Sequence, residues 1–388
     1  MSHKERIAYL EAIRKRYRRS SRKNKKLILD EFCAVCGFNR KYAIRILNQP
    51  SACIKRKRGR KSRYCDPWFL RALLNIWKAT DYMCSSRLKA VIPVWLPCYE
   101  NSFEPLADDI RSLLLNISRA TLDRVLRPLR ARYGRGMCGT KPSTMLRNQI
   151  PIRTSNWDIT QPGYMEADTV AHCGNSLAGN FIWSLTMTDI NTAWTECRAV
   201  WNKGSQEVID RVHDIENKLP FTLLAFDCDN GSEFLNFHLV RYFADRESPV
   251  YFTRSRPYKK NDNAHVEQKN WAHPRHLLGY DRLDNPALVP LINNLYANEW
   301  SLYQNYFCPS VKLLSKIRIG AKYRKTYDNP KTPYQRVLES DIVAESTKRQ
   351  LSNCKQTLNP FRLKKTIERK LKAIFRNVPV TAFVRQRI

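Results

Sequence analysis

Residues 221–234, FTLLAFDCDNGSEF, carry the transition from an apolar run to an acidic turn that decides the fold. The first part, 221–226, is a short apolar run of the kind that fills a buried parallel strand. It leads into Asp229 and Gly231, and glycine permits a tight turn into a following helix. Ligands of open α/β sheets bind beyond the carboxyl ends of the strands, so Asp229 is predicted to lie at such a site.

Further strands and helices are predicted on both sides of this stretch. The hydrophobic periodicity predicts three strands before it, at 164–171, 181–189 and 193–201, and one after it, at 249–253. Helices are predicted at 205–218, 233–246 and 264–278. The expected order is therefore β-β-β-α-β-α-β-α. On the first strand, Glu166, Asp168 and Val170 share one face.

Three acidic residues are predicted to meet at one edge of this sheet. Asp168 lies on the first strand, Asp229 follows the fourth strand, and Glu267 lies in the first turn of the last helix. Three converging carboxylates are costly to assemble without a cation, because like charges repel. They indicate a metal-dependent enzyme that cuts or joins a phosphate backbone. Neighbouring acids are interpreted as helix-start or surface carboxylates: Glu166, Asp227 and Glu233.

Two motifs around these acids resemble those of a known superfamily. The first is the block of residues 229–234, DNGSEF, and the second is Asn263-x-x-Val266-Glu267. Asp229 and Glu267 are 38 positions apart (267 minus 229), close to the spacing usual in that superfamily. The chain resembles the retroviral-integrase superfamily, and most closely the DDE transposases of bacterial insertion sequences. The resemblance covers roughly residues 160–310.

The resemblance implies an RNase H-like α/β core, with a mixed five-stranded sheet, preceded by an all-α helix-turn-helix region. It implies a transposase that binds insertion-sequence ends, cleaves DNA and transfers the freed 3′-OH to target DNA. Asp168, Asp229 and Glu267 would hold two Mg²⁺ ions, with Mn²⁺ as a substitute, and would stabilise the attacking and leaving oxygens. The implied partner is double-stranded DNA, as terminal inverted repeats and as target. At least a homodimer is expected, because two ends are processed together.

Composition supports a nucleic-acid partner independently of the motifs. The 388 residues include 68 Lys plus Arg and 35 Asp plus Glu, for a net charge of +33. Such a charge opposes compaction unless a polyanion neutralises it. The first residues are too charged for a signal peptide, and no apolar run reaches the length of a transmembrane helix. We therefore expect a cytoplasmic, nucleoid-associated protein.

Cysteine is unusually frequent, with 12 residues scattered along the chain. Without an export signal they are expected to be reduced thiols. Cys33 and Cys36 form a CxxC, but a second pair at zinc spacing is missing. Small buried side chains are therefore favoured over a zinc site.

The regions outside the core are basic. The whole chain is predicted to divide into six parts: 1–54, a helix-turn-helix unit; 55–65, a basic linker; 66–135, a second helical unit; 136–160, a linker; 161–310, the catalytic core; and 311–388, a basic C-terminal region. The first unit has apolar residues available for its core, namely Leu27, Ile28, Phe32, Val35, Tyr42, Ile44, Ile46 and Leu47. Its second helix leaves Arg40, Lys41 and Arg45 for solvent or DNA. A plain helical hairpin with a solvated face is the alternative.

Further DNA contacts are predicted in three segments. In the linker, Arg58 and Arg60 suit a narrow minor groove, although a solvated linker explains them equally. In the second unit, Ser118 is expected to cap a helix at about 120–133. Arg119, Thr121 and Arg124 are expected to face DNA there, and Pro128 is expected to kink or end the helix. In the loop at 254–263, Lys259 and Lys260 are candidates for backbone contacts. Tyr258 and Trp271 are interpreted as packing residues.

Two other functions remain open from the sequence. One is a domesticated, catalytically inert DNA-binding regulator. The other is a nuclease of the same fold that cleaves without joining. Terminal inverted repeats flanking the gene would favour a transposase over both. The sequence does not decide whether the region after residue 310 contacts DNA or mediates assembly.

Overall fold

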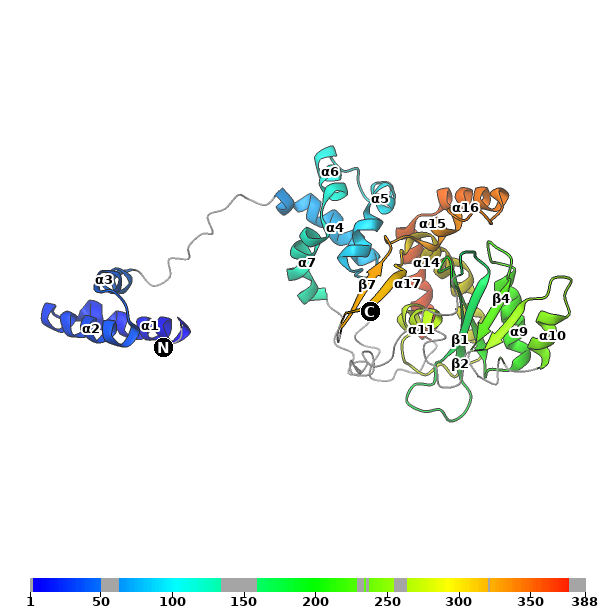
Figure 1. The fold of residues 1–388 in the computed structure, drawn as a ribbon, viewed down its shortest axis with the longest axis horizontal. Helices are drawn as coiled ribbons and strands as arrows, with labels where there is room; N and C mark the ends of the chain where they lie inside the picture. Colours follow the sequence, from blue (N-terminus) through cyan, green and yellow to red (C-terminus); the bar gives the residue numbers. More distant parts are fainter. Residues whose placement is uncertain are drawn as a thin grey trace. The chain divides into compact units, whose positions relative to one another are not determined.

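The computed structural model describes residues 3–49, 63–133, 159–228, 234, 237–254, 264–319 and 322–376. The chain divides into two compact units, Met1–Arg63 and Tyr64–Ile388. Figure 1 labels many of their helices and strands. None of the described helices is long and apolar enough to cross a membrane.

The first unit consists of α1 (His3–Arg19), α2 (Arg22–Cys36) and α3 (Arg40–Asn48). Ser21 caps α2 through the backbone N–H of Asn24, and Gly37 ends it with a positive φ of 66°. That conformation costs glycine little, which explains the turn at this position. Cys36 is buried in the core of the unit, and burial raises the pKa of its thiol.

Half of the core predicted for this unit is wrong. The side chains of Ile28, Phe32, Ile46 and Leu47 are buried. By contrast, four predicted core residues are exposed: Leu27 (63%), Val35 (47%), Tyr42 (41%) and Ile44 (38%). The buried residues of α2 are Ile28, Leu29, Phe32 and Cys36, which form one face of the helix. Leu27 and Val35 directly precede Ile28 and Cys36, and each points about 100° away from the residue that follows it, outside that face.

A short 3₁₀ turn, η1 (Arg63–Cys65), spans the boundary between the units. Four helices of the second unit follow it: α4 (Pro67–Ala79), α5 (Ser85–Ser102), α6 (Asp108–Asn116) and α7 (Arg119–Tyr133). Ser118 accepts a hydrogen bond from the backbone N–H of Thr121 at 3.2 Å, which confirms the predicted cap. Pro128 does not end the helix, because α7 continues to Tyr133, so that part of the prediction is wrong. Pro128 is exposed, so water can solvate the carbonyl that loses its partner.

These four helices share one hydrophobic core with helices from the C-terminal half of the chain. The indole Nε1 of Trp95 donates to the carbonyl oxygen of Phe307 at 3.3 Å. The hydroxyl of Tyr303 donates to the carbonyl oxygen of Ala79 at 2.7 Å. The Lys364 ammonium pairs with Asp81 at 2.7 Å. Helices α4–α7 are therefore part of the larger compact unit.

A five-stranded sheet forms the centre of this unit. Its strands are β1 (Tyr164–Ala171), β2 (Ile182–Asp189), β3 (Thr195–Trp201), β4 (Ala225–Cys228) and β5 (Tyr251–Arg254). The spatial order is β3-β2-β1-β4-β5. Strands β1, β2 and β3 pair antiparallel, whereas β4 pairs parallel to both β1 and β5. Helices α9 (Ser205–Glu216), α10 (Phe237–Ala244) and α11 (Ala264–Asn270) alternate with the later strands, so the predicted element order is confirmed.

The two faces of the sheet carry different layers. Met165 and Ala167 of β1 pack into the core that includes Val208 of α9 and Leu239 of α10. The alternate residues of β1 face α11, which follows β5 in the sequence. This alternation confirms the predicted division of the first strand into two faces.

The remaining elements follow α11 in sequence. They are η2 (Trp271–Arg275, a π-helical turn), α12 (His276–Leu278), α13 (Leu288–Leu295), η3 (Tyr296–Trp300, a second π-helical turn), α14 (Ser301–Phe307), β6 (Leu313–Ile319), β7 (Lys322–Tyr327), α15 (Pro333–Leu338), α16 (Glu345–Thr357) and α17 (Pro360–Arg376). Strands β6 and β7 form a separate two-stranded sheet.

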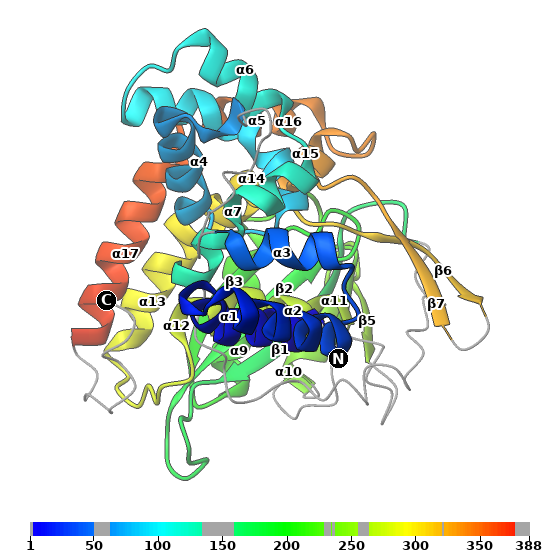
Figure 2. The same ribbon diagram turned by 90° about the vertical axis from the view of Figure 1, so that its left-hand side faces the viewer.

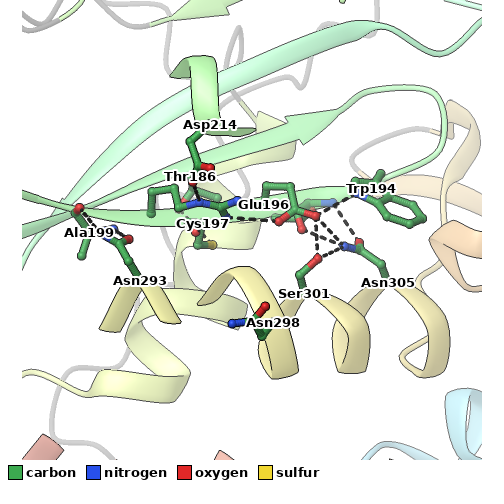
Figure 3. A network of polar contacts seen from close by, with 12 residues as sticks. Thr186, Trp194, Glu196, Cys197, Ala199, Asp214, Asn293, Asn298, Ser301 and Asn305 are labelled. Atoms are coloured by element: carbon green, nitrogen blue, oxygen red, sulfur yellow. Dashed lines mark hydrogen bonds and ion pairs between the residues drawn. The ribbon is translucent and has the colours of Figure 1, made fainter. Parts of the chain in front are cut away.

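Side chains close the outer edge of β3. The Asn305 side-chain amide accepts from the Thr195 N–H and donates to the Thr195 carbonyl, both at 3.0 Å. Asn293 binds the N–H and carbonyl of Ala199 in the same way, at 2.7 and 2.9 Å. Figure 3 shows both amides approaching the strand from the helices. They replace a neighbouring strand, which protects the edge from pairing with another chain.

A buried charged cluster lies on the same strand (Figure 3). Arg198 is fully buried, and its guanidinium pairs with Asp214 of α9 at 2.5 Å and with Glu196 at 3.3 Å. Glu196 also accepts from the hydroxyl of Ser301 at 2.6 Å and from the indole of Trp194 at 3.0 Å. Burial raises the pKa of Glu196, while Arg198 and the hydrogen-bond donors oppose that shift. The cluster ties β3 to α9 and α14.

Candidate active site

Asp168 lies near the middle of the sheet. It is on β1, the central strand, opposite Thr186 of β2. One carboxylate oxygen, Oδ1, accepts the backbone N–H of Thr169 at 2.7 Å. The other, Oδ2, accepts the side-chain amide N–H of Asn270 at 2.6 Å. Both oxygens of Asp168 thus act as acceptors.

The end of β4 lies beside Asp168. In the parallel pairing of β1 with β4, Ala167 is opposite Cys228, the last residue of β4. Asp229 follows Cys228 directly in the sequence, but it lies outside the described residues, as does Asn230. The described pairing therefore includes Ala167 and Cys228, the residues directly before Asp168 and Asp229.

Two hydrogen bonds hold α11 along β1. The buried backbone N–H of Val266 donates to Glu166 Oε2 at 3.0 Å, and Asn270 donates to Asp168. Four helical residues advance by about 6 Å and two strand residues by about 6.6 Å, so the two contacts match in spacing. Glu267 belongs to α11, three positions before Asn270, and thus on the same side of the helix. The structure describes the backbone of Glu267 but not its side chain.

The neighbouring acids have structural partners. Glu166 binds the first turn of α11, as expected of a helix-start carboxylate. The surface interpretation is wrong for both Glu166 and Asp227, which are only 1% and 4% exposed. Asp227 accepts the hydroxyl of Thr253 at 2.7 Å, so it joins β4 to β5. Glu233 lies outside the described residues.

Two residues that follow Glu267 differ in environment. The Lys269 ammonium donates to the carbonyl oxygen of Ala193 at 3.4 Å, and burial lowers its pKa to about 8. Trp271 is 64% exposed, so the interpretation of this residue as a packing residue is wrong. The π-helical turn η2 begins at Trp271, directly after the last residue of α11. Tyr258 lies outside the described residues.

The predicted DNA contacts of the first unit lie on α3. Arg40 forms an ion pair with Asp30 of α2. Lys41 is exposed, and the Arg45 guanidinium lies over the Tyr42 ring, 5.1 Å from its centre. All three side chains are on the surface of the unit, as a DNA contact requires. Arg58, Arg60, Lys259 and Lys260 lie outside the described residues.

The predicted DNA contacts of the second unit lie in the first turns of α7. Arg119 and Arg124 are exposed, and Thr121 is half-buried, with its hydroxyl 2.9 Å from that of Ser118. Arg119 lines a cavity of about 450 Å³, together with Ser85, Asp123 and Arg130. The Arg130 guanidinium binds both Asp123 and Ser85, so one wall of this cavity is itself hydrogen-bonded.

The strand order and the pairing define the fold. A mixed five-stranded sheet, with a helix across its central acid and an all-helical region before it, fits an integrase-like core. No protein-family model matches the chain. The chain is 42% identical over 336 residues to "Uncharacterized protein y4rM" of Sinorhizobium fredii, across 85% of this chain and 94% of that protein. It therefore belongs to the same family as y4rM.

Among solved structures, the catalytic core of HTLV-2 integrase in complex with magnesium (dimeric form) is similar to part of the chain. It is 15% identical, with a TM-score of 0.28, and the match covers 38% of this chain and 90% of that core. The simian T-cell lymphotropic virus intasome in complex with the PP2A regulatory subunit B56 gamma is 14% identical, with a TM-score of 0.32, over 62% of this chain and 73% of that chain.

Proposed function

We propose that this chain is a DDE-type transposase, a polynucleotidyl transferase that cleaves DNA at insertion-sequence ends and joins the freed 3′-OH to target DNA. One observation carries the proposal. The hydrogen bonds from Val266 and Asn270 hold α11, which contains Glu267, along the strand that contains Asp168. Strand β4, paired beside it, ends one residue before Asp229.

The chemistry of the donor set fits Mg²⁺. Mg²⁺ prefers hard oxygen ligands and keeps several waters, so a few carboxylates suffice to hold it. Both oxygens of Asp168 accept N–H hydrogen bonds, as an ionised carboxylate does. Asp168, Asp229 and Glu267 would hold two ions. Such ions, when bound, stabilise the charge on the attacking and leaving oxygens of an in-line displacement.

The protein's own residues would position the acids. Asn270 restrains the side chain of Asp168, and Glu166 fixes the first turn of α11 against β1. Binding of Mg²⁺ would thus begin with Asp168 and Glu267 on backbones that are already held, which reduces the cost of ordering them. A water would first attack the phosphodiester at the element end and release a 3′-OH. That hydroxyl would then attack target DNA, so one P–O bond forms as another breaks.

The partners follow from the same proposal. Double-stranded DNA, as element ends and as target, would neutralise part of the net charge of +33. Exposed basic residues of α3 and α7 are proposed to contact the ends, with Arg45 and Arg124 among them. Joining two ends in one reaction requires two active sites, so we propose a dimer or a higher oligomer on DNA.

The test uses the purified full-length protein, labelled duplexes from both flanks of its gene, a supercoiled plasmid and Mg²⁺. We expect joined products that carry the label on the plasmid. Asp168→Asn, Asp229→Asn and Glu267→Gln should each abolish joining while DNA binding persists. Asp210→Asn is the matched control, since Asp210 is an exposed acid of α9 that binds only the neighbouring Gln206 in the described contacts.

The outcomes separate the proposal from its alternatives. Cleaved ends without joined products would indicate a nuclease that cuts only. Binding to the flanks without either product, in the presence of Mg²⁺ or Mn²⁺, would indicate an inert regulator. Wild-type joining by any of the three acid variants would remove that residue from the catalytic set.

A further inference from the structure

A two-stranded ribbon extends from the C-terminal part of the larger unit. It consists of β6 and β7, and we call it the basic ribbon. The two strands pair antiparallel with each other and, within the described part of the chain, with no other strand. Figure 2 shows the ribbon reaching outward from the helices and the sheet of its unit.

The base of the basic ribbon is firmly attached. The backbone N–H of Asp328 donates to the carbonyl oxygen of Lys312 at 2.9 Å, directly below the paired strands. The Asp328 carboxylate accepts the N–H of Lys312 at 2.6 Å and the guanidinium of Arg336 at 2.7 Å. Arg336 also donates to the carbonyl oxygen of Ser310 at 3.0 Å. A fixed base means that the arm is held in a defined direction.

The charge on the ribbon has one sign. Its two strands contain five basic residues and no acidic ones: Lys316, Arg318, Lys322, Arg324 and Lys325. Lys316 and Lys325 are directly opposite each other in the register. Like charges in that arrangement destabilise an isolated pair of strands. A partner of negative charge would convert this repulsion into attraction.

The ribbon also exposes apolar side chains that a folded protein would normally cover. Leu314, Ile317 and Ile319 are 66%, 58% and 59% exposed. Ile317 is opposite Arg324, so apolar and basic residues share one face. An isolated two-stranded ribbon is at best marginally stable in water. Its exposed residues therefore indicate a surface that another molecule covers.

The charge decides between two occupants. A second copy of this chain would bring the same net charge of +33, which opposes contact through a basic arm. Duplex DNA supplies phosphates, and its major groove admits a two-stranded ribbon. Apolar side chains on such a ribbon can contact thymine methyl groups or base steps.

We propose that the basic ribbon is a DNA-binding arm that lies in a groove of duplex DNA, with its basic residues on the flanking phosphates. This rests on the proposed function only for the identity of the DNA as an element end or target. It assigns a role to a region outside the acid site and outside α3 and α7.

The test measures binding of the full-length protein to a fluorescent duplex of mixed sequence, between about 50 and 200 mM salt. The first variant neutralises two exposed ribbon residues, Arg324→Gln and Lys325→Gln. The matched control neutralises two exposed residues of the α9–α10 region, Lys218→Gln and Arg241→Gln. Both variants lose the same charge, so a general effect of net charge cancels between them.

A second variant removes the ribbon without disturbing its base. Residues 313–327 are replaced by Asn-Gly, which forms a two-residue hairpin turn. The existing hydrogen bond from the Asp328 N–H to the Lys312 carbonyl is the bond that closes such a turn. Thermal melting and the mass in solution without DNA are measured for each variant.

The expected result is a smaller dependence of log K on log salt. Each lost phosphate contact reduces the slope by about 0.9, so the double variant should lose about 1 to 2, and the ribbon deletion more. The control should keep the wild-type slope. Equal slopes for the ribbon variants and the control would overturn the inference and leave the transposase proposal standing.

Two further outcomes are decisive. A ribbon deletion that lowers the mass of the free protein, with unchanged salt dependence, would make the ribbon a contact between copies and overturn the DNA assignment. Failure of the wild-type protein to bind any duplex would defeat the inference and the proposed function together. Where the wild-type protein does bind duplex DNA, joining activity is measured separately with the flank duplexes, so the proposed function is tested independently of the ribbon.

Discussion

The side-chain amide of Asn270 donates a hydrogen bond of 2.6 Å to Oδ2 of Asp168, across 102 positions of sequence. It links the last residue of α11 to the central strand of the sheet. Asn270→Ala removes the donor that restrains the Asp168 carboxylate. Loss of such a supporting contact typically costs about 10- to 100-fold in metal affinity or activity. We expect joining to fall by that factor and to require more Mg²⁺, while DNA binding stays unchanged.

The control for this prediction is Asn298→Ala, since Asn298 is an exposed residue of η3 that bonds only to the Asn294 carbonyl in the described contacts. Asn270→Asp supplies a stricter test, because it places one carboxylate against another. Asn270→Asp should reduce joining activity more than Asn270→Ala does. Normal joining by Asn270→Asp at low Mg²⁺ would show that the contact does not support the site.

The central sheet was largely predictable from the sequence. The first strand has the predicted bounds, Tyr164–Ala171, and its acids Glu166 and Asp168 alternate with Met165 and Ala167 along the sequence. The apolar run at 221–226 was a less precise guide, since β4 is Ala225–Cys228. A short apolar run does not fix its own register, which depends on pairing with β1. The link between Asn270 and Asp168 depends on the same long-range packing.

Other features were not accessible from local patterns. The helix predicted at 264–278 is present, but it contains the π-helical turn η2, which has no clear sequence signal. The last two helices, α16 and α17, are separated at Leu358 and Asn359, although neither Gly nor Pro stands at those two positions. The roles of Asn293 and Asn305 were missed, although polar residues in a largely apolar helical segment were a signal. Their partners lie about a hundred positions earlier in the chain.

The π-helical turn η3 explains how both amides reach β3. Asn293 and Asn305 are 12 positions apart (305 minus 293). In a regular α-helix, 12 residues rotate by about 1200°, which leaves the two side chains about 120° apart. One π-helical turn absorbs one extra residue, so the effective rotation is about 1100° and the difference about 20°. The turn thus brings both side chains to one side of the helix.

Asn305→Ala should destabilise the larger unit. Asn305 is fully buried, and its loss leaves the N–H and the carbonyl of Thr195 without their partner. Two unsatisfied buried groups cost about 2–4 kcal/mol in the free energy of unfolding. Urea unfolding measures the loss, and light scattering detects aggregation through the opened strand edge. Asn298→Ala should leave both unchanged, and equal stability of the two variants would contradict the edge argument.

Deletions should separate the two compact units. Removing residues 1–63 leaves the core of the larger unit intact, because that unit begins at Tyr64. We expect this variant to melt cooperatively and to cleave DNA, but to lose its preference for the gene's flanks. Removing residues 1–135 also removes Trp95 and the other α4–α7 residues of the shared core, so it should not fold. Unchanged preference for the flanks in the shorter deletion would refute the end-binding role of α1–α3.

A half-buried lysine makes stability depend on pH. The Lys355 ammonium of α16 lies 3.1 Å from the centre of the Phe307 ring, and burial lowers its pKa to about 8 from 10.5. Between these values the unfolded chain holds a proton that the folded chain has released, so stability rises with pH. Relative to Lys355→Met, the free energy of unfolding of the wild type should rise by about 2 kcal/mol between pH 7 and pH 10, as measured by urea unfolding. Lys348→Met, which removes an ion pair with Glu345 on the same helix, is the control. If the difference in the free energy of unfolding between wild type and Lys355→Met stays constant from pH 7 to pH 10, the Lys355 ammonium is solvated and the prediction is wrong.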